Sequence, residues 1–496
     1  MRTSGILLHI SSLPSPYGIG TFGKEAYKFV DFLKGAGQRF WQILPLGPTS
    51  FGDSPYQSFS TFAGNPYFID LDTLVNEGLL ENGDLEKLSL CETPNKVDYE
   101  TLYNERFPIL EKAFSNFDIN NKEFIEFKKQ NEWLKDYALF MALKEENDDI
   151  PWYEWPEALK LRKPAELEKA TKRLDSEINF WSFLQFKFYS QWHKLKDYAN
   201  KNDVHIIGDI PIYVAHDSAD VWTNVQNFEL DQKNNPINVA GCPPDGFSAT
   251  GQLWGNPLYD WKYMKKNNYD WWIKRLKASA NLYDVIRIDH FRGFESYYSI
   301  PYGEETALNG KWRKGPGISF FNAVKKQIGN LNIIAEDLGY LTQEVIDMRK
   351  QTGFPGMKIM EFAFDSREAG DYLPHNYDKN SVAYIGTHDN PTALGWLNTV
   401  NAEDKQYMME YFDFDNDLGL VWKIIRKTFA SVSDLVIIQM QDYLVLGDEA
   451  RMNTPSTLGD NWTWRTDLGS FSDDLKYSIL KITNLYQRNN SLLDEE

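Results

Sequence analysis

Four short apolar stretches of the sequence end in an acidic residue, and helical segments separate them. Residues 285–288 (Val-Ile-Arg-Ile) are followed at once by Asp289. Branched apolar residues in so short a run predict a buried strand, on which Arg287 and Asp289, two positions apart, point to the same face. The other three stretches end near Asp209, at Glu336 and at Asp389. If these strands are parallel, their carboxylates gather at one end of the sheet.

Strand-like and helical stretches alternate along most of the chain. Strands are expected at 5–10, 40–46, 204–214, 285–288, 331–336, 356–364, 381–389 and 435–445. Helices are expected at 23–35, 124–143, 181–198, 263–281, 320–328, 342–350, 418–430 and 475–487. A strand–helix–strand order requires a parallel sheet, and eight such strands predict an α/β fold, the (β/α)8 or TIM barrel.

Two long segments interrupt the alternation and are expected to be insertions. Residues 51–200 begin as a loop rich in Pro, Gly and aromatic residues and continue as a mainly helical segment. Residues 215–275 include a second aromatic loop at 241–261, which suits a lid over a cleft. A structural loop with buried rings is the alternative. We expect residues 1–496 to form a single catalytic barrel domain carrying these two insertions.

Composition excludes several classes of partner. The formal net charge is −19 and the pI is near 4.9, so binding to nucleic acid or to an anionic membrane is not expected. Aromatic residues make up 15% of the chain, which suits a sugar-binding cleft. Two cysteines exclude a disulfide framework, the N-terminal apolar run is too short for a signal peptide, and no stretch reaches the length of a membrane span. A cytoplasmic protein is expected; its oligomeric state stays open.

The sequence offers little for a metal ion. His216, Asp217 and Asp220 lie close together, but their spacing matches none of the usual metal motifs. Asp217 and Ser218 more plausibly cap the next helical turn. No metal and no organic cofactor are expected.

The carboxylates themselves favour glycoside transfer. That reaction needs an ionised carboxylate at the anomeric carbon and a neutral carboxyl group at the leaving oxygen. Asp289 beside Arg287 suits the first role, although a structural salt bridge is an open alternative. Glu336 on an apolar strand suits the second, because burial raises the pKa of a carboxyl group. His290 and His388 can hydrogen-bond sugar hydroxyls.

Longer motifs place the chain beside a known family. They are SLPSPYGIG at 12–20, PLGPTSFGDSPYQSFS at 45–60, GDIPIYV at 208–214, the loop at 241–259, RIDHFRGF at 287–294, AEDLG at 335–339 and GTHDN at 386–390. Through them the chain, from residue 5 to about 465, closely resembles glycoside hydrolase family 77, the amylomaltase family of 4-α-glucanotransferases in the α-amylase superfamily. The resemblance implies a TIM barrel without a C-terminal β-sandwich domain, and malto-oligosaccharides and α-1,4-glucans as substrates.

The resemblance also implies roles for individual residues. Asp289 is implied as the nucleophile, Glu336 as the acid/base and Asp389 as the transition-state stabiliser. The residues implied in binding are Tyr56, Asp209, Arg287, His388, Asn390, Gln252, Phe247, Trp254 and Phe362. Phe51 stands where relatives often have tyrosine at a secondary glucan contact, so a ring can stack there without a hydroxyl bond.

The expected mechanism is retaining and passes through a covalent β-glucosyl enzyme. Two carboxyl groups in these roles are expected about 5–5.5 Å apart. The nearest rival function is an α-glucan hydrolase on the same barrel. A noncatalytic sugar-binding barrel is a rival of another class.

Overall fold

Eight parallel strands close into a barrel in the computed structural model, which describes residues 2–86, 88, 95–244, 248–339, 341–365 and 370–489. The strands are β1 (Thr3–Leu7), β2 (Phe40–Gln42), β3 (His205–Ile210), β6 (Val285–Ile288), β9 (Ile333–Ala335), β10 (Gly356–Ile359), β11 (Ser381–Tyr384) and β12 (Leu435–Gln439). Their order around the barrel is β1-β12-β11-β10-β9-β6-β3-β2, so chain neighbours are also spatial neighbours. The predicted (β/α)8 fold is confirmed.

Most barrel strands end earlier than predicted. The strand predicted at 40–46 is β2, which ends at Gln42. The strand predicted at 356–364 is β10, which ends at Ile359 and is followed by a 3-10 turn at Met360–Phe362. Ile43 and Leu44 beyond β2 are nevertheless fully buried. Apolar residues at the ends of the predicted strands therefore indicate burial and not strand pairing. Ile43 and Leu44 no longer belong to a strand, but their side chains are still buried.

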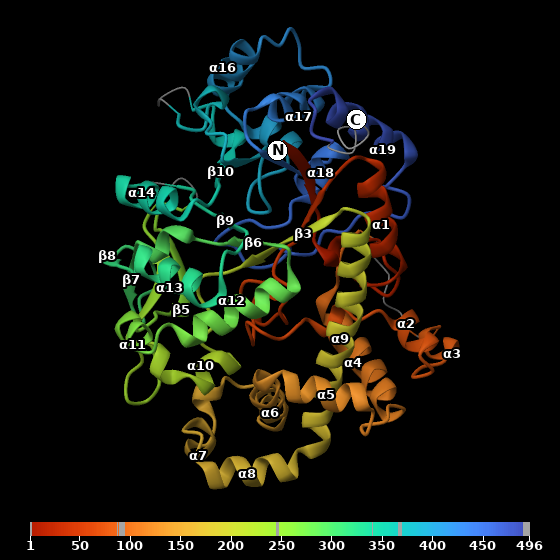
Figure 1. Ribbon diagram of the computed structural model, residues 1–496, viewed down its shortest axis with the longest axis vertical. Coiled ribbons are helices and arrows are strands. Elements are labelled where there is room, and N and C mark those ends of the chain that lie inside the picture. Colours follow the sequence, from red (N-terminus) through yellow and green to blue (C-terminus); the bar gives the residue numbers. More distant parts are fainter. Residues whose placement is uncertain are drawn as a thin grey trace.

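Helices cover the outside of the barrel (Figure 1). They include α1 (Lys24–Gly35), α12 (Asp270–Leu282), α13 (Ile318–Ile328), α14 (Gln343–Thr352), α15 (Ala393–Thr399), α16 (Ala402–Phe412), α17 (Leu420–Ala430) and α19 (Asp473–Leu485). The face that each buries is apolar: Phe29, Val30 and Leu33 of α1 are fully buried. β12 is followed by α18 (Met440–Tyr443) and then α19. Among the described residues, no helix combines the length and the apolar character needed to cross a membrane.

The connection from β2 to β3 is mainly helical. It contains α2 (Leu71–Asn76), α3 (Asn82–Leu85), α4 (Tyr99–Ser115), α5 (Lys122–Gln130), α6 (Glu132–Glu146), α7 (Glu157–Lys160), α8 (Pro164–Arg173) and α9 (Asp175–Lys201). Helices α5 to α8 gather at one end of the molecule, and α9 runs from there back to the barrel (Figure 1). The helix expected at 124–143 is two helices, because Asn131 between them leaves the helical region with φ −115° and ψ 79°.

A second, four-stranded sheet was not predicted. It has the antiparallel order β5-β4-β7-β8, formed by β4 (Asn238–Cys242), β5 (Gln252–Pro257), β7 (Ser296–Pro301) and β8 (Lys311–Lys314). The expectation of a loop at 241–261 is therefore wrong for residues 241–242 and 252–257. A Gly- and Pro-rich stretch reads as a loop, but it pairs with β4, which pairs in turn with β7 from a different barrel connection.

Apart from β4 and β5, the regular structure between β3 and β6 is helical. α10 (Ala219–Thr223) begins after Ser218, whose hydroxyl accepts a hydrogen bond from the Val221 amide as the cap. The helix expected at 263–281 is divided into α11 (Trp261–Lys266) and α12. Tyr269, with φ 57° in the left-handed region, lies at the break.

Candidate active site

Asp289 and Glu336 follow two strands that lie side by side in the barrel. Ile288 of β6 is paired with Ala335 of β9, so the next residue of each strand is the carboxylate. The ladder continues one step further, because the Glu336 amide donates to the Ile288 carbonyl at 3.1 Å. Pairing of β6 with β9 thus brings these two side chains to the same point of the barrel mouth.

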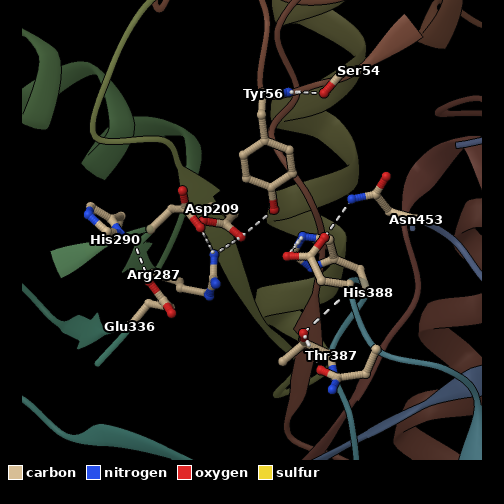
Figure 2. Close-up of polar contacts among 12 residues, drawn as sticks. Ser54, Tyr56, Asp209, Arg287, His290, Glu336, Thr387, His388 and Asn453 are labelled. Atoms are coloured by element: carbon tan, nitrogen blue, oxygen red, sulfur yellow. Dashed lines mark hydrogen bonds and ion pairs between the residues drawn. The ribbon is translucent and has the colours of Figure 1, made fainter. Parts of the chain in front are cut away.

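Arg287 connects Asp289 to the floor of the site. One of its Nη atoms lies 3.2 Å from Asp289 and 2.5 Å from Asp209, and the Tyr56 hydroxyl donates to the same Asp209 oxygen at 2.8 Å (Figure 2). The Asp209 side chain is 0% exposed, whereas that of Asp289 is 28% exposed. Asp209 therefore lies beneath the cleft and holds Arg287 and Tyr56 in place.

Glu336 lies on the other side of Arg287 from His388 (Figure 2). One of its carboxyl oxygens accepts a hydrogen bond of 2.6 Å from the backbone amide of His290, which adopts the left-handed φ of 50°. Burial, and then the nearby charge of Asp289, raise the pKa of Glu336 to about 8. At neutral pH this carboxyl group therefore holds a proton.

The pKa of Asp289 is also raised by burial, and Arg287 lowers it in opposition. Arg287 makes a direct ion pair with Asp289 and none with Glu336 among the described contacts. The charge of Asp289 raises the pKa of Glu336, so the two carboxyl groups titrate together, and the one beside the guanidinium loses its proton first. Arg287 thus favours the ionised form of Asp289, whereas the pKa of Glu336 is raised to about 8.

Asp389 is held by a loop far along the chain. Asn453 donates to one Asp389 carboxyl oxygen at 2.6 Å, and Arg451 donates to the Asp389 carbonyl at 2.6 Å. The other carboxyl oxygen lies 3.3 Å from Nε2 of His388. Burial lowers the pKa of His388 to about 4, so the ring is neutral near pH 7 and can hydrogen-bond a hydroxyl.

Aromatic rings line the cleft on both sides of the carboxylates. Tyr56 stacks on His388 with ring centroids 5.2 Å apart, and Trp462 packs against both rings. On the Glu336 side, Trp254 meets His290 edge-on at 4.8 Å. Burial lowers the pKa of His290 to about 3, which leaves that ring neutral as well.

Eleven of the predicted residues line one cleft of about 2750 Å³, and Asp209 lies beneath it. Its described lining includes Tyr56, Gln252, Trp254, Arg287, Asp289, His290, Glu336, Phe362, His388, Asp389 and Asn390. This volume exceeds the roughly 300–1,000 Å³ of most small-ligand pockets and suits an extended ligand. Asn390 uses its side-chain oxygen locally, accepting from the amide and hydroxyl of Thr387. Phe247 and the side chain of Phe51 lie outside the described residues.

The fold and the cleft agree with the comparison to known families. The family model described as 4-alpha-glucanotransferase, that of glycoside hydrolase family 77, matches residues 8–469. The chain belongs to glycoside hydrolase family 77. Family 77 membership makes it a glycosyl-transferring enzyme, and the resemblance drawn from the motifs is confirmed.

Relatives match over nearly their whole length. The 4-alpha-glucanotransferase of Clostridium butyricum is 54% identical over 97% of this chain and 100% of its own. That of Streptococcus pneumoniae is 51% identical over 99% of each chain. Among solved structures, the amylomaltase of Streptococcus agalactiae in complex with acarbose is similar with a TM-score of 0.96 and 43% identity, over 98% of this chain and 100% of that one.

The sequence analysis missed the loop that carries Arg451 and Asn453. Within this family 77 chain, Asn453 also donates its amide to the His388 carbonyl at 3.1 Å, so the loop holds two successive residues of the site. No periodicity or strand-ending pattern marks residues 451–453, and only the folded chain brings them beside Asp389.

The residues considered as metal ligands have other partners. Asp217 accepts from Lys144 at 2.7 Å and from the Trp152 amide at 3.2 Å, and His216 bonds the Asn234 carbonyl. The described part of the chain contains no group of three or more His, Cys, Asp or Glu side chains placed to hold a metal ion.

Proposed function

We propose that this chain is a retaining 4-α-glucanotransferase that moves α-1,4-glucan segments from a donor malto-oligosaccharide to the 4-hydroxyl of an acceptor. The observation that carries the proposal is the pair Asp289 and Glu336, placed by adjacent strands in one cleft. One of them faces Arg287, and the pKa of the other is raised to about 8. Retaining glycoside chemistry needs this division between an anionic and a neutral carboxyl group.

In the first step an oxygen of Asp289 attacks the anomeric carbon of the donor. The glycosidic C–O bond breaks, and its oxygen takes the proton of Glu336 and leaves as the 4-hydroxyl of the departing sugar. The product is a β-glycosyl ester on Asp289 and an ionised Glu336. Asp389, fixed by Asn453, is placed to stabilise the oxocarbenium-like transition state and to bond ring hydroxyls.

In the second step an acceptor sugar enters on the Glu336 side. Its 4-hydroxyl gives its proton to Glu336 while its oxygen attacks the anomeric carbon, and the bond to Asp289 breaks. A new α-1,4 linkage forms and both carboxyl groups return to their starting states. The separation of about 5–5.5 Å between them stays a prediction of this mechanism.

Transfer requires that a bound sugar outcompete water. A well-oriented bound hydroxyl reaches an effective molarity of about 10⁵ M or more, far above the concentration of water. The rings of Tyr56, Trp254 and Trp462 that border the cleft provide surfaces for orienting glucose units. As the resemblance implies, Gln252, Phe362, Phe247 and Phe51 also contribute to binding of the glucan.

The function is tested by the products formed from maltotriose. We expect glucose and longer oligomers, with the total number of reducing ends constant, because each bond broken is matched by a bond made. The measurement is a time course of reducing ends beside an oligosaccharide profile. A rise in reducing ends that follows substrate loss one for one would make the enzyme a hydrolase.

Activity on natural donors is expected to fall as the pH rises through about 8. The acid/base must be protonated to assist the leaving sugar, and the pKa of Glu336 is raised to about 8, so its neutral form is lost above that pH. The check is kcat/KM for maltotriose from pH 4 to 10, with an unfolding curve at each pH as the control. A profile that falls only near pH 5 would contradict the raised pKa.

We further infer a cytoplasmic location and a single catalytic domain. The first agrees with two cysteines in 496 residues. The second agrees with insertions at about 51–200 and about 215–275 that contribute Tyr56, Gln252 and Trp254 to the cleft of the barrel.

A further inference from the structure

An exposed tryptophan lies at the edge of the second sheet and lines the catalytic cleft. Trp312 belongs to β8, which is an edge strand, and 42% of the residue is exposed. It shares the cleft with Asp289 and Glu336. A partly exposed indole at a cleft wall offers a large apolar surface to a ligand in that cleft.

The register of the sheet puts Trp312 in a row with other apolar positions. Leu253, Gly241, Tyr298 and Trp312 are directly opposite one another on β5, β4, β7 and β8. Residues opposite each other on antiparallel strands point to the same face. Leu253, 38% exposed, also lines the cleft, so the two ends of the row border it, while Tyr298 between them is buried.

Trp312 is held in a fixed orientation by its neighbours. The Arg292 guanidinium carbon lies 3.9 Å from the ring centroid, and Tyr298 meets the ring edge-on with centroids 5.3 Å apart. Arg292 itself is buried. One face of the indole is therefore covered by a cation, and the ring is already ordered before any ligand arrives, which reduces the entropy cost of binding.

Arg292 places this ring on the Glu336 side of the site. It lies three residues after Asp289, in the 3-10 turn Phe291–Phe294, and the Phe291 amide in the same turn donates to the Glu336 carbonyl. Arg292 and Glu336 both line the cleft. His388 lies on the opposite side of Arg287 (Figure 2), and both Tyr56 and Asp389 contact His388.

We propose that Trp312, clamped by Arg292, is an acceptor-side glucan-binding platform that receives the second glucose unit of the acceptor. The inference rests on the proposed function, in which Glu336 bonds the 4-hydroxyl of the first acceptor unit. Arg292 lines the same cleft as Glu336 and covers one face of the Trp312 ring, so we assign the exposed part of the ring to the next unit of the chain. The apolar C–H face of a glucose packs on an indole, while its hydroxyls remain free for polar contacts.

The test uses a donor that cannot react as an acceptor. With α-maltotriosyl fluoride blocked at its non-reducing 4-hydroxyl, fluoride leaves as the C–F bond breaks, the maltotriosyl group is transferred to the enzyme, and the blocked hydroxyl cannot accept a sugar. The initial burst of fluoride released without acceptor then gives the concentration of active enzyme in each preparation. Transfer to added maltotriose or to added glucose is measured over a range of acceptor concentrations, for the wild type and for Trp312→Ala, Trp312→Leu and Trp312→Phe.

For Trp312→Ala and Trp312→Leu we expect the KM of maltotriose as acceptor to rise about tenfold, as for loss of a well-packed aromatic contact. The KM of glucose should change less than twofold, and Trp312→Phe should keep most of the affinity for maltotriose. A leucine keeps apolar contact with Arg292 but has no ring on which a glucose can pack. Trp312→Leu therefore tests the same prediction if Trp312→Ala fails to fold.

Tyr302→Ala is the matched control. Tyr302 follows β7 in the same sheet and is 53% exposed, but it is not part of the described cleft lining, so its removal should leave both acceptor KM values unchanged. A maltotriose KM within twofold of wild type for Trp312→Ala and Trp312→Leu would overturn the assignment, as would an equal loss with glucose. A wild type that passes the blocked sugar only to water would instead contradict the proposed transfer itself.

Discussion

Replacing Asp289 with alanine is expected to lower turnover on maltotriose by about 10⁴-fold or more while the protein stays folded. Without this carboxylate no covalent intermediate can form, and Arg287 loses one of its two anionic partners but keeps Asp209 at 2.5 Å. The measurement is the steady-state rate together with thermal unfolding. Asp417→Ala, an exposed carboxylate paired with Lys405, is the control and should retain full activity.

Adding azide to Asp289→Ala distinguishes a nucleophilic role of Asp289 from a structural one. In Asp289→Ala the missing side chain leaves room for azide to attack the anomeric carbon of an α-maltotriosyl fluoride, with inversion. We expect recovery of turnover and a β-glycosyl azide as the product. Activity near wild type in Asp289→Ala, or an α-glycosyl azide from this variant, would contradict the nucleophile assignment.

Replacing Glu336 with glutamine is expected to lower turnover on maltotriose by about 10³-fold, within the range for loss of a general acid–base group. Glutamine keeps the shape of the side chain and can still accept the hydrogen bond that the His290 amide makes to Glu336 at 2.6 Å. It cannot donate the proton that a departing sugar needs. The measurement is kcat for maltotriose beside the burst of fluoride from α-maltotriosyl fluoride.

The two donors should respond differently to this change. Fluoride leaves without protonation, so the fluoride burst should fall far less than turnover of maltotriose, and the glycosyl enzyme should accumulate. Azide added to Glu336→Ala should give an α-glycosyl azide, the opposite anomer from that of Asp289→Ala. Equal losses on both donors would mean that Glu336 does not act as the proton donor.

The centre of the site could be predicted from the sequence because strand adjacency follows chain order in this barrel. Once residues 285–288 and 331–336 are recognised as successive parallel strands, Asp289 and Glu336 have to meet at their ends. Arg287 was placed beside Asp289 by the two-residue spacing of an extended chain. These inferences need only local pattern and one rule of topology.

Other features depend on pairing between distant segments, which local pattern does not encode. β5 reads as a loop in the sequence and becomes a strand by pairing with β4, which pairs with β7 more than 50 residues further along the chain. Asn453 reaches Asp389 across 64 residues through a loop with no regular pattern. The burial of Asp209 beneath Arg287 could not be predicted either, because the sequence does not indicate whether a carboxylate at a strand end faces the cleft or the interior of the barrel.

Trapping of the covalent intermediate is the most direct test of the account. Glu336→Gln is mixed with α-maltotriosyl fluoride blocked at its non-reducing 4-hydroxyl, quenched in acid, and analysed by intact and peptide mass spectrometry. We predict a mass increase of one blocked maltotriosyl group, located on the peptide that contains Asp289. A glycosyl group attached to any other residue, or rapid fluoride release with no covalent species at any time, would contradict it.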